Sequence, residues 1–136
     1  MKSYKTPLRY PGGKSRACTK MDAFFPDLRD YKEYREPFLG GGSVAIHITK
    51  KYPHLDIWVN DLYEPLYNFW RVLQDDGRVL YERLQDLKST HPDEESARKL
   101  FLESKDIVND YTVSNLFRAS SFYIVNKCSF SGLTES

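Results

Sequence analysis

The segment Phe38-Leu39-Gly40-Gly41-Gly42-Ser43 is the feature that most limits what this chain can fold into. It follows residues 34–38, a short strand candidate, and precedes residues 43–51, where Val44, Ile48 and Lys51 recur at helical spacing. Glycine permits a tight turn and lets backbone N–H groups approach a ligand with no Cβ in the way. The sequence therefore predicts a strand, a glycine turn and a helix, in that order.

A second strand candidate covers residues 55–59 and is closed by Asn60-Asp61. A strand, a helix and a strand in succession form one βαβ unit, whose two strands should be parallel with a right-handed crossover. We therefore predict an α/β protein that contains this unit. Ahead of the unit, Ala17, Met21 and Phe24 recur at helical spacing and Pro26 follows, which predicts a helix over residues 14–25.

The glycine turn and Asp61 together predict a cofactor site. Gly40, Gly42 and Ala45 fit the pattern G-x-G-x-x-[GA], and the helix that follows offers a partial positive charge at its N-terminus. Asp61 lies nineteen residues beyond Gly42, where such a unit carries the acid that binds ribose hydroxyls. These features indicate a cofactor that contains a nucleoside, and the spacing does not identify which one.

From Leu62 onward the pattern becomes helical. One apolar stripe runs over residues 62–87 with an interruption at Gly77, and further helices are predicted over residues 96–108 and 112–126. Thr90-His91-Pro92-Asp93 indicates a capped helix start, with the proline at an early helical position. We therefore divide the chain into a cofactor-binding part, residues 1–61, and a helical part, residues 62–136.

Composition excludes several protein classes. No apolar stretch approaches the roughly 20 residues of a membrane helix. Two cysteines and three histidines show no metal-ligand spacing and no disulfide framework, which fits a reducing, cytoplasmic environment. Residues 1–21 carry six basic and no acidic side chains, whereas the rest of the chain has an acidic excess. A basic amino-terminal segment on an otherwise mildly acidic chain suits contact with a polyanion such as DNA.

The sequence does not match two motifs, the phosphate-binding loop and the nucleophile elbow. A phosphate-binding loop ending at Gly13-Lys14-Ser15 would need glycine at position 8, which is Leu8. Ser43 only partly fits the nucleophile-elbow pattern and is better explained as a residue at a helix start. Arg9 and Lys14 remain as two cations around an aromatic turn, a set suited to phosphate or base-edge contacts.

Four segments resemble the amino-terminal half of Dam-like adenine-specific DNA methyltransferases. In family order, they are Leu8-Arg9-Tyr10-Pro11-Gly12-Gly13-Lys14, Glu36-Pro37-Phe38-Leu39-Gly40-Gly41-Gly42-Ser43-Val44, Asn60-Asp61 and Asn126-Lys127-Cys128-Ser129-Phe130-Ser131-Gly132-Leu133. The resemblance implies a partial S-adenosylmethionine-dependent methyltransferase (Rossmann-like) fold, with a helical segment that begins the target-recognition region. It also implies S-adenosylmethionine as the methyl donor and double-stranded DNA as the substrate, as in restriction-modification.

The resemblance further implies roles for individual residues. The donor would be bound by Tyr10, Gly12, Gly13, Lys14, Glu36, Pro37, Phe38, Gly40, Gly42, Ser43 and Asp61. DNA would be contacted by Arg9, Lys14, Lys127, Phe130, Ser131 and Leu133. Arg9 falls where the family has a cation that reads a base, and Phe130 and Ser131 fall where residues insert near the extruded base.

One departure from the family is important. The catalytic signature [DN]-P-P-[YFW] is absent, because the sequence contains no Pro-Pro pair. That signature accepts hydrogen bonds from the adenine amino group and stacks on the flipped base. We therefore expect an amino-terminal fragment that binds the donor, transfers no methyl group alone and lacks a carboxy-terminal half.

Two alternatives stay open. One is a non-catalytic DNA- or protein-binding remnant of the same fold, which would have no reason to bind the donor. The other is an NAD-linked oxidoreductase, which shares the loop and the acid but leaves the motif around Tyr10 unexplained.

Overall fold

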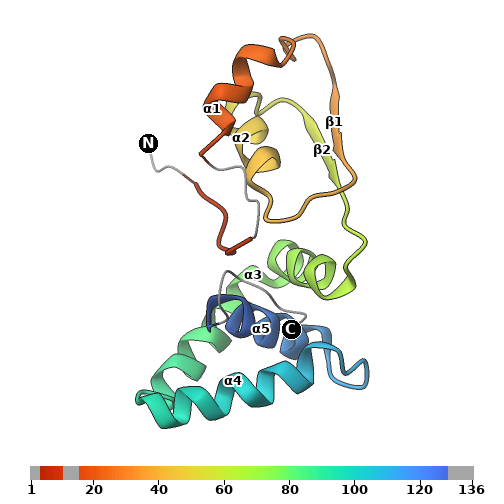
Figure 1. Cartoon of the computed structure of the whole chain (residues 1–136). Helices are drawn as coiled ribbons and strands as arrows, with labels where there is room; N and C mark the ends of the chain where they lie inside the picture. The colour runs from red at the N-terminus through yellow and green to blue at the C-terminus, as the bar shows by residue number, and fades with distance from the viewer. Residues whose placement is uncertain (1–3, 11–15, 129–136) are drawn as a thin grey trace. The chain divides into compact units, whose positions relative to one another are not determined.

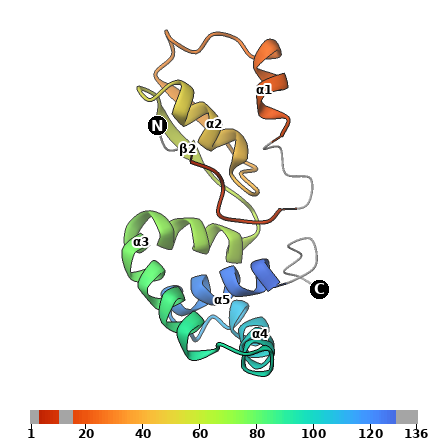
Figure 2. The same cartoon turned by 90° about the vertical axis from the view of Figure 1, so that its left-hand side faces the viewer.

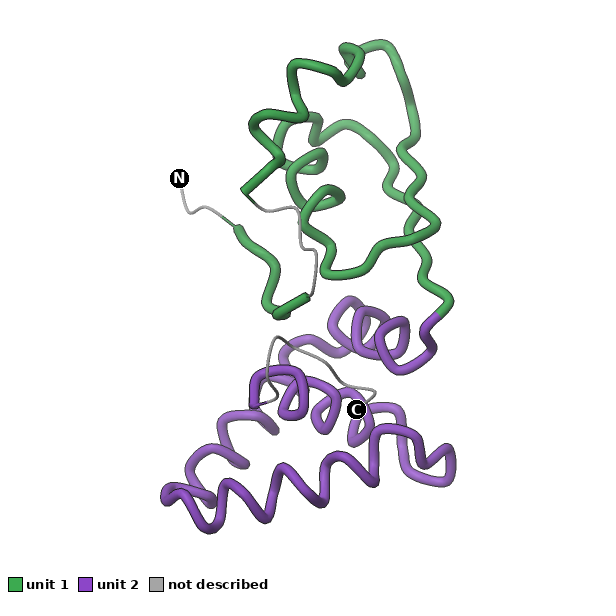
Figure 3. The backbone as a smooth tube through the Cα atoms, viewed as in Figure 1, with its two compact units in different colours: residues 1–62 green, residues 63–136 purple. Residues whose placement is uncertain are grey.

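The computed structural model describes residues 4–10 and 16–128. Contacts between Cα atoms divide the chain into two compact units, residues 1–62 and 63–136, which Figure 3 shows in different colours. The assignment of donor binding and target recognition to two parts of the chain stays a prediction.

Unit 1 contains the βαβ arrangement. Strand β1 (Glu33–Glu36) pairs in parallel with β2 (Asp56–Val59), and α2 (Ser43–Lys51) connects them (Figure 1). The predicted order and the parallel direction are confirmed, and α2 has the predicted bounds. Strand β1 ends two residues earlier than predicted, where Pro37 has no N–H to donate to a ladder.

The core of unit 1 lies between α2 and one face of this sheet. Its buried residues are Cys18, Val44, Ile48, Tyr52 and Leu55, with Met21, Phe25, Leu28, Tyr34 and Ile57 packed against them. Side chains alternate along the strands, so Trp58 lies on the other face, where it is 54% exposed. The guanidinium of Arg35 lies 6.0 Å from the Trp58 ring centroid on that face.

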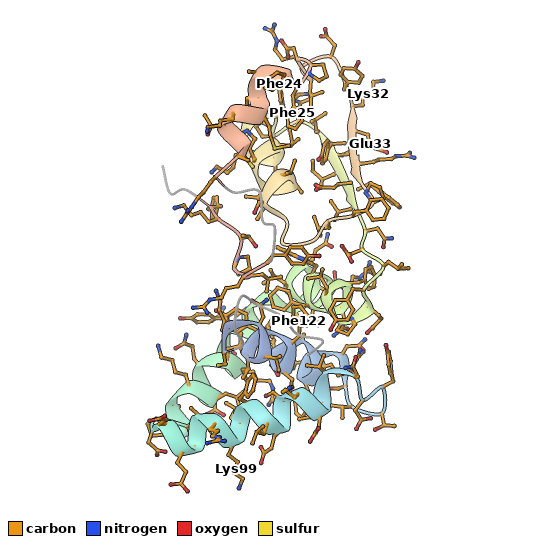
Figure 4. All side chains as sticks on the ribbon, in the orientation of Figure 1. Phe24, Phe25, Lys32, Glu33, Lys99 and Phe122 are labelled. Atoms are coloured by element: carbon orange, nitrogen blue, oxygen red, sulfur yellow. The ribbon has the colours of Figure 1, made fainter. Side chains whose placement is uncertain are left out.

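The first helical segment is shorter than the predicted helix over residues 14–25. Helix α1 covers Cys18–Met21, the 3₁₀ turn η1 covers Asp22–Phe24, and residues 14 and 15 lie outside the described residues. The helical spacing expected for Phe24 is wrong, because its side chain is 87% exposed, while Phe25 packs on the core. Figure 4 labels both rings. Pro26 favours extended backbone at the preceding residue, and Phe25 has φ −82° and ψ 142°.

An ion pair joins η1 to α2. His47 Nε2 lies 2.8 Å from Asp22 Oδ1, and Lys51 Nζ lies 3.5 Å from the same oxygen. The hydrogen bond with His47 is the main cause that lowers the pKa of Asp22. His47 therefore makes a structural contact between η1 and α2.

Unit 2 is helical. It contains α3 (Glu64–Thr90), α4 (Glu94–Val108) and α5 (Asn115–Cys128), and α5 packs against both of the others (Figures 1 and 2). The buried apolar residues of these helices are Leu66, Phe69, Val72, Leu80, Val108, Ala119, Phe122 and Val125. The rings of Phe69 and Phe122 lie 5.6 Å apart at the centre of this core.

The boundaries in unit 2 differ from the prediction at several places. Helix α5 covers Asn115–Cys128 rather than the predicted residues 112–126. Leu62 precedes α3 and is 91% exposed, so it does not belong to the apolar stripe. The interruption expected at Gly77 is a kink at Asp76, with φ −135° and ψ 36°, and Figure 2 shows α3 bending there. Asp93 is the N-cap of α4 and forms a capping box with Ser96, so Pro92 precedes the helix.

The buried guanidinium of Arg118 contacts residues of all three helices of unit 2. Arg118 on α5 is only 3% exposed, and its Nη1 donates to Glu64 Oε1 at 3.2 Å. Its Nε donates to the carbonyl of Val108 at 3.4 Å, and its Cζ lies 4.4 Å from the Tyr111 ring centroid. The sequence pattern gave no indication of this contact set.

Within the described part of the chain, no helix has both the length and the apolar character needed to span a membrane. The same residues hold no cluster of three or more histidine, cysteine, aspartate or glutamate side chains suited to a metal ion.

Candidate functional site

The glycine segment forms a tight turn between β1 and α2. The N–H of Gly42 donates to the carbonyl of Leu39 at 3.0 Å, and the carbonyl of Gly42 accepts the first helical hydrogen bond from Ile46 at 3.0 Å. Gly40 and Gly42 have left-handed φ angles of 57° and 78°, which other residues rarely adopt. Gly42 is the N-cap of α2 and has no side chain to cap it. The helix therefore begins with its N–H groups at the glycine turn.

The chain that leaves β2 is hydrogen-bonded to this turn. Asn60 N donates to the carbonyl of Glu36, and Leu39 N donates to the carbonyl of Asn60, both at 2.9 Å. Gly40 N donates to Asp61 Oδ2 at 2.9 Å. These bonds fix the half-buried Asp61 carboxylate against the glycine turn. A carboxylate can accept about four hydrogen bonds, so it can hold the turn and a ligand hydroxyl together.

The segment of residues 4–10 packs on the glycine turn from the amino-terminal side. The hydroxyl of Thr6 donates to the carbonyl of Gly41. A Cβ built on Gly41 would lie 2.8 Å from Tyr10 Cβ, and one built on Gly40 would lie 3.0 Å from Tyr10 Cε1. Glycine at both positions is therefore required for the close approach of Tyr10.

These elements surround a cavity of about 260 Å³, which we name the donor cavity after the role that the sequence predicts for its residues. This volume is just below the usual lower limit of about 300 Å³ for small-molecule sites. Seven residues predicted to bind the donor line it: Tyr10, Glu36, Phe38, Gly40, Gly42, Ser43 and Asp61. Leu39, Gly41 and Val44 also line it, and Pro37 does not. Gly12, Gly13 and Lys14 lie outside the described residues.

Among the described residues that line the donor cavity, the charged side chains are two carboxylates, Glu36 and Asp61. The hydroxyl of Tyr34 donates to Glu36 Oε2 at 3.1 Å and supports this side chain from the core side. Burial, together with the charge of Glu36, raises the pKa of Tyr34. Tyr34 therefore stays protonated and keeps donating to Glu36. A cavity with two carboxylates suits a ligand that carries hydroxyl groups and positive charge.

The residues predicted to contact DNA are divided between the two units. Arg9 is exposed in unit 1, one residue before Tyr10 of the donor cavity. Lys127 is on α5 in unit 2, where its Nζ lies 5.5 Å from the Tyr123 ring centroid. Lys14, Phe130, Ser131 and Leu133 lie outside the described residues. Their roles stay predictions.

Sequence reasoning missed Thr6 and the contact that Tyr10 makes with the middle glycine. The hydrogen bond from Thr6 and the approach of Tyr10 explain why the turn has three consecutive glycines where the pattern G-x-G needs two. The third glycine was the feature of the sequence that could have indicated a close contact at this turn.

Residues 10–136 match the family described as D12 class N6 adenine-specific DNA methyltransferase. The chain belongs to this family. The predicted Dam-like relationship is therefore confirmed. The family implies an S-adenosylmethionine-dependent methyltransferase fold, and the described residues form helices and one two-stranded parallel sheet. A complete Rossmann-like sheet stays a prediction.

Two curated relatives are similar over nearly the whole chain. The Type II methyltransferase M.MjaIII of Methanocaldococcus jannaschii is 28% identical over 133 residues, which covers 93% of this chain and 46% of the relative. The DNA N-6-adenine-methyltransferase of Escherichia phage P1 is 25% identical over 128 residues, which covers 94% of this chain and 16% of the relative. The chain thus spans about half the length of the first and about one-sixth of the second.

Proposed function

We propose that this chain binds S-adenosylmethionine in the donor cavity and serves the site-specific methylation of adenine amino groups in double-stranded DNA. Family membership supports the reaction class. The observation that carries the proposal is the hydrogen bond from Gly40 N to Asp61 Oδ2, at 2.9 Å. It joins a glycine turn, a helix start and a carboxylate in one cavity, as a nucleoside-bearing ligand requires.

The donor cavity fits the chemistry of the donor. Asp61 would accept hydrogen bonds from the ribose hydroxyls, and Glu36 would lie beside the ammonium group of the amino acid end. Tyr10 and Phe38 supply aromatic surface at the rim, where they are 43% and 80% exposed. The glycines leave the backbone open to close approach, since a Cβ at Gly40 or Gly41 would meet Tyr10. When bound, S-adenosylmethionine supplies an electrophilic methyl group on a sulfonium.

DNA contact belongs to the same proposal. Arg9 would read a base edge, and Lys14 and Lys127 would contact the DNA from the two parts of the chain. Phe130, Ser131 and Leu133 would lie near the extruded adenine.

Methyl transfer needs more than residues 1–136 provide. The adenine amino nitrogen is a poor nucleophile, because its lone pair is delocalised into the ring. The family signature [DN]-P-P-[YFW] would accept hydrogen bonds from that amino group, and the chain contains no Pro-Pro pair. We therefore expect the chain alone to bind the donor without transferring its methyl group, and to act with a polypeptide segment that carries this signature.

Calorimetric titration with S-adenosylmethionine tests the donor site. Asp61→Ala should weaken binding roughly ten- to hundredfold, because a hydrogen bond to a charged group contributes about 1.5–3 kcal/mol. Asp56→Ala is the matched control, since this exposed carboxylate lies on β2, five residues earlier. Asp56→Ala should bind like the parent chain. Equal affinity of the Asp61→Ala and parent chains would contradict the role of Asp61.

The same titration separates the proposal from a non-catalytic binding module. A pure interaction module would not bind the donor, so an absence of heat from the parent chain would favour it. Incorporation of tritium from labelled donor into mixed-sequence DNA tests the catalytic statement. Labelling by the purified chain alone would overturn it.

A further inference from the structure

A second cavity in unit 1, of about 390 Å³, is larger than the donor cavity. Three segments line it: residues 4–6, the residues around the start of α1, and one side of α2. Its charged lining consists of Lys5, Arg16 and Lys50, together with His47. We call it the basic cavity.

The basic cavity has no carboxylate among the described residues that line it. Asp22 contacts His47 from outside the lining and also pairs with Lys51. The cations of Lys5, Arg16 and Lys50 come from three separate segments, so no single run of basic sequence explains their convergence. Like charges at one cavity repel one another, and an anionic ligand relieves that repulsion.

Hydrogen bonds hold the walls of the basic cavity in place. Lys50 Nζ donates to the carbonyl of Tyr4 at 3.3 Å, which joins α2 to the amino-terminal segment. The thiol of the buried Cys18 lies 3.8 Å from the carbonyl of Ser43, which joins α1 to the start of α2. Thr6 is fixed by its bond to Gly41. An ammonium group has three donors, so Lys50 can hold Tyr4 and an anion together.

The basic cavity is close to the donor cavity. Ser43 lines both of them. The amino-terminal segment contributes Lys5 to the basic cavity and Tyr10 to the donor cavity. Five residues span at most about 18 Å when fully extended, which equals roughly five base-pair steps of 3.4 Å. One short duplex can therefore reach both cavities.

We propose that the basic cavity binds a backbone phosphate of the DNA whose adenine is presented to the donor. This proposal rests on the proposed function, because it assigns the phosphate to the DNA substrate. A phosphodiester is always charged, and arginine, lysine and threonine side chains are its usual donors. Such a contact carries no sequence information and sets the register of the duplex on the protein. It gives Lys5, Arg16 and Lys50 a positioning role.

The test compares two triple variants of equal charge loss. The first is Lys5→Gln, Arg16→Gln and Lys50→Gln. The control is Lys32→Gln, Lys88→Gln and Lys99→Gln, three exposed lysines outside the cavity, of which Lys32 and Lys99 are labelled in Figure 4. Circular dichroism confirms that both are folded. Binding to a fluorescent 20-base-pair duplex is measured by anisotropy between 50 and 200 mM salt.

Each lost phosphate contact should reduce the slope of log K against log salt by about 0.9. Because the cavity is proposed to hold one phosphate, we expect the cavity variant to lose about one such unit and the control variant clearly less. An equal change in both variants would overturn the proposal, as would a parent chain that binds no duplex at 50 mM salt. Micromolar binding of inorganic phosphate with an unchanged DNA slope would identify a site for a free anion and would also overturn it.

Donor titration of the cavity variant distinguishes this proposal from the proposed function. Donor affinity equal to that of the parent chain, with a reduced DNA slope, supports the phosphate site. Loss of donor affinity in the variant would assign the basic cavity to the donor carboxylate and overturn the proposal. A parent chain that binds DNA with the expected slopes but binds no donor would refute the donor site and support the phosphate site.

Discussion

Gly41→Ala tests whether Tyr10 is held at the donor cavity by the glycine turn. Gly40 and Gly42 have left-handed φ angles, whereas Gly41 does not, so alanine at position 41 introduces no backbone strain of that kind. The new Cβ would lie 2.8 Å from Tyr10 Cβ. Rotation of the tyrosine side chain leaves its Cβ in place, so the backbone of Tyr10 must move.

The size of the effect follows from this distance. Carbon atoms pack at about 3.5–4.0 Å, so Tyr10 must withdraw by roughly 0.7–1.2 Å. A gap of about 0.5–1 Å loses a quarter to a half of a contact energy, and an aromatic ring stacked on a base contributes about 1–3 kcal/mol. Taking a contact of about 2 kcal/mol, the loss is about 0.5–1 kcal/mol, which corresponds to roughly two- to fivefold weaker donor binding.

The assay is a double-mutant cycle by calorimetry with S-adenosylmethionine. Tyr10→Gly removes both the ring and the Cβ that the new methyl group meets, and it should lose the whole tyrosine contact. In that background Gly41→Ala should cause no further loss, so the two effects should be non-additive. Additive losses, or full donor affinity in the single variant Gly41→Ala, would refute the idea that Tyr10 transmits the effect.

Three further predictions concern stability in unit 2. Gly77→Ala should raise the free energy of unfolding by about 0.5–1 kcal/mol in urea denaturation and leave donor binding unchanged, because the new Cβ would meet its nearest side chain at an ordinary 3.7 Å. The pKa of Asp93 is lowered from its usual 3.8 by the hydrogen bond from the backbone of Ser96, so this cap stabilises α4 above about pH 4 and is lost as the pH falls through the lowered pKa. The melting temperature of Asp93→Ala should therefore be lower than that of the parent at pH 7, and thermal melts followed by circular dichroism should show this difference shrinking as the pH falls through the lowered pKa of Asp93. Glu64→Ala leaves the guanidinium of Arg118 buried without its carboxylate and should cost about 3 kcal/mol in urea denaturation, and adding Arg118→Met should recover part of that loss.

The βαβ unit could be predicted because local patterns determine it. The glycine turn separates a strand pattern from a helix pattern, and parallel pairing follows from the helical crossover between the two strands. In the register of the sheet Glu36 pairs with Val59, so the chain leaves both strands at the same edge. Gly40 and Asp61 are 21 residues apart in the sequence, and this geometry brings them within hydrogen-bond distance.

The contact between residues 4–10 and the glycine turn could not be predicted from local patterns. Periodicity describes a segment against its own neighbours, whereas Thr6 and Gly41 are 35 residues apart. Only the family resemblance named Tyr10, and nothing named Thr6. The basic cavity could not be predicted from the sequence either. Its three cations, Lys5, Arg16 and Lys50, come together only when three separate segments pack.

In unit 2 the helices were predicted and their exact packing was not. Apolar spacing identifies Leu66 and Phe69 as core, and both are 1% exposed. Apolar spacing does not predict that Arg118 is buried. A charged side chain is almost never buried without a partner, and the pattern does not show the partner. The partner here is Glu64, 54 residues away.

The proposed donor binding can be measured separately from methyl transfer. The described residues that line the donor cavity, apart from Tyr10, lie between Glu36 and Asp61, so one βαβ unit supplies most of the site. The residues that would activate the adenine belong to a Pro-Pro signature that the 136 residues do not contain. A donor titration therefore reports on the geometry of the glycine turn without interference from turnover, and each variant at Tyr10, Gly41 or Asp61 can be interpreted as a change in binding free energy alone.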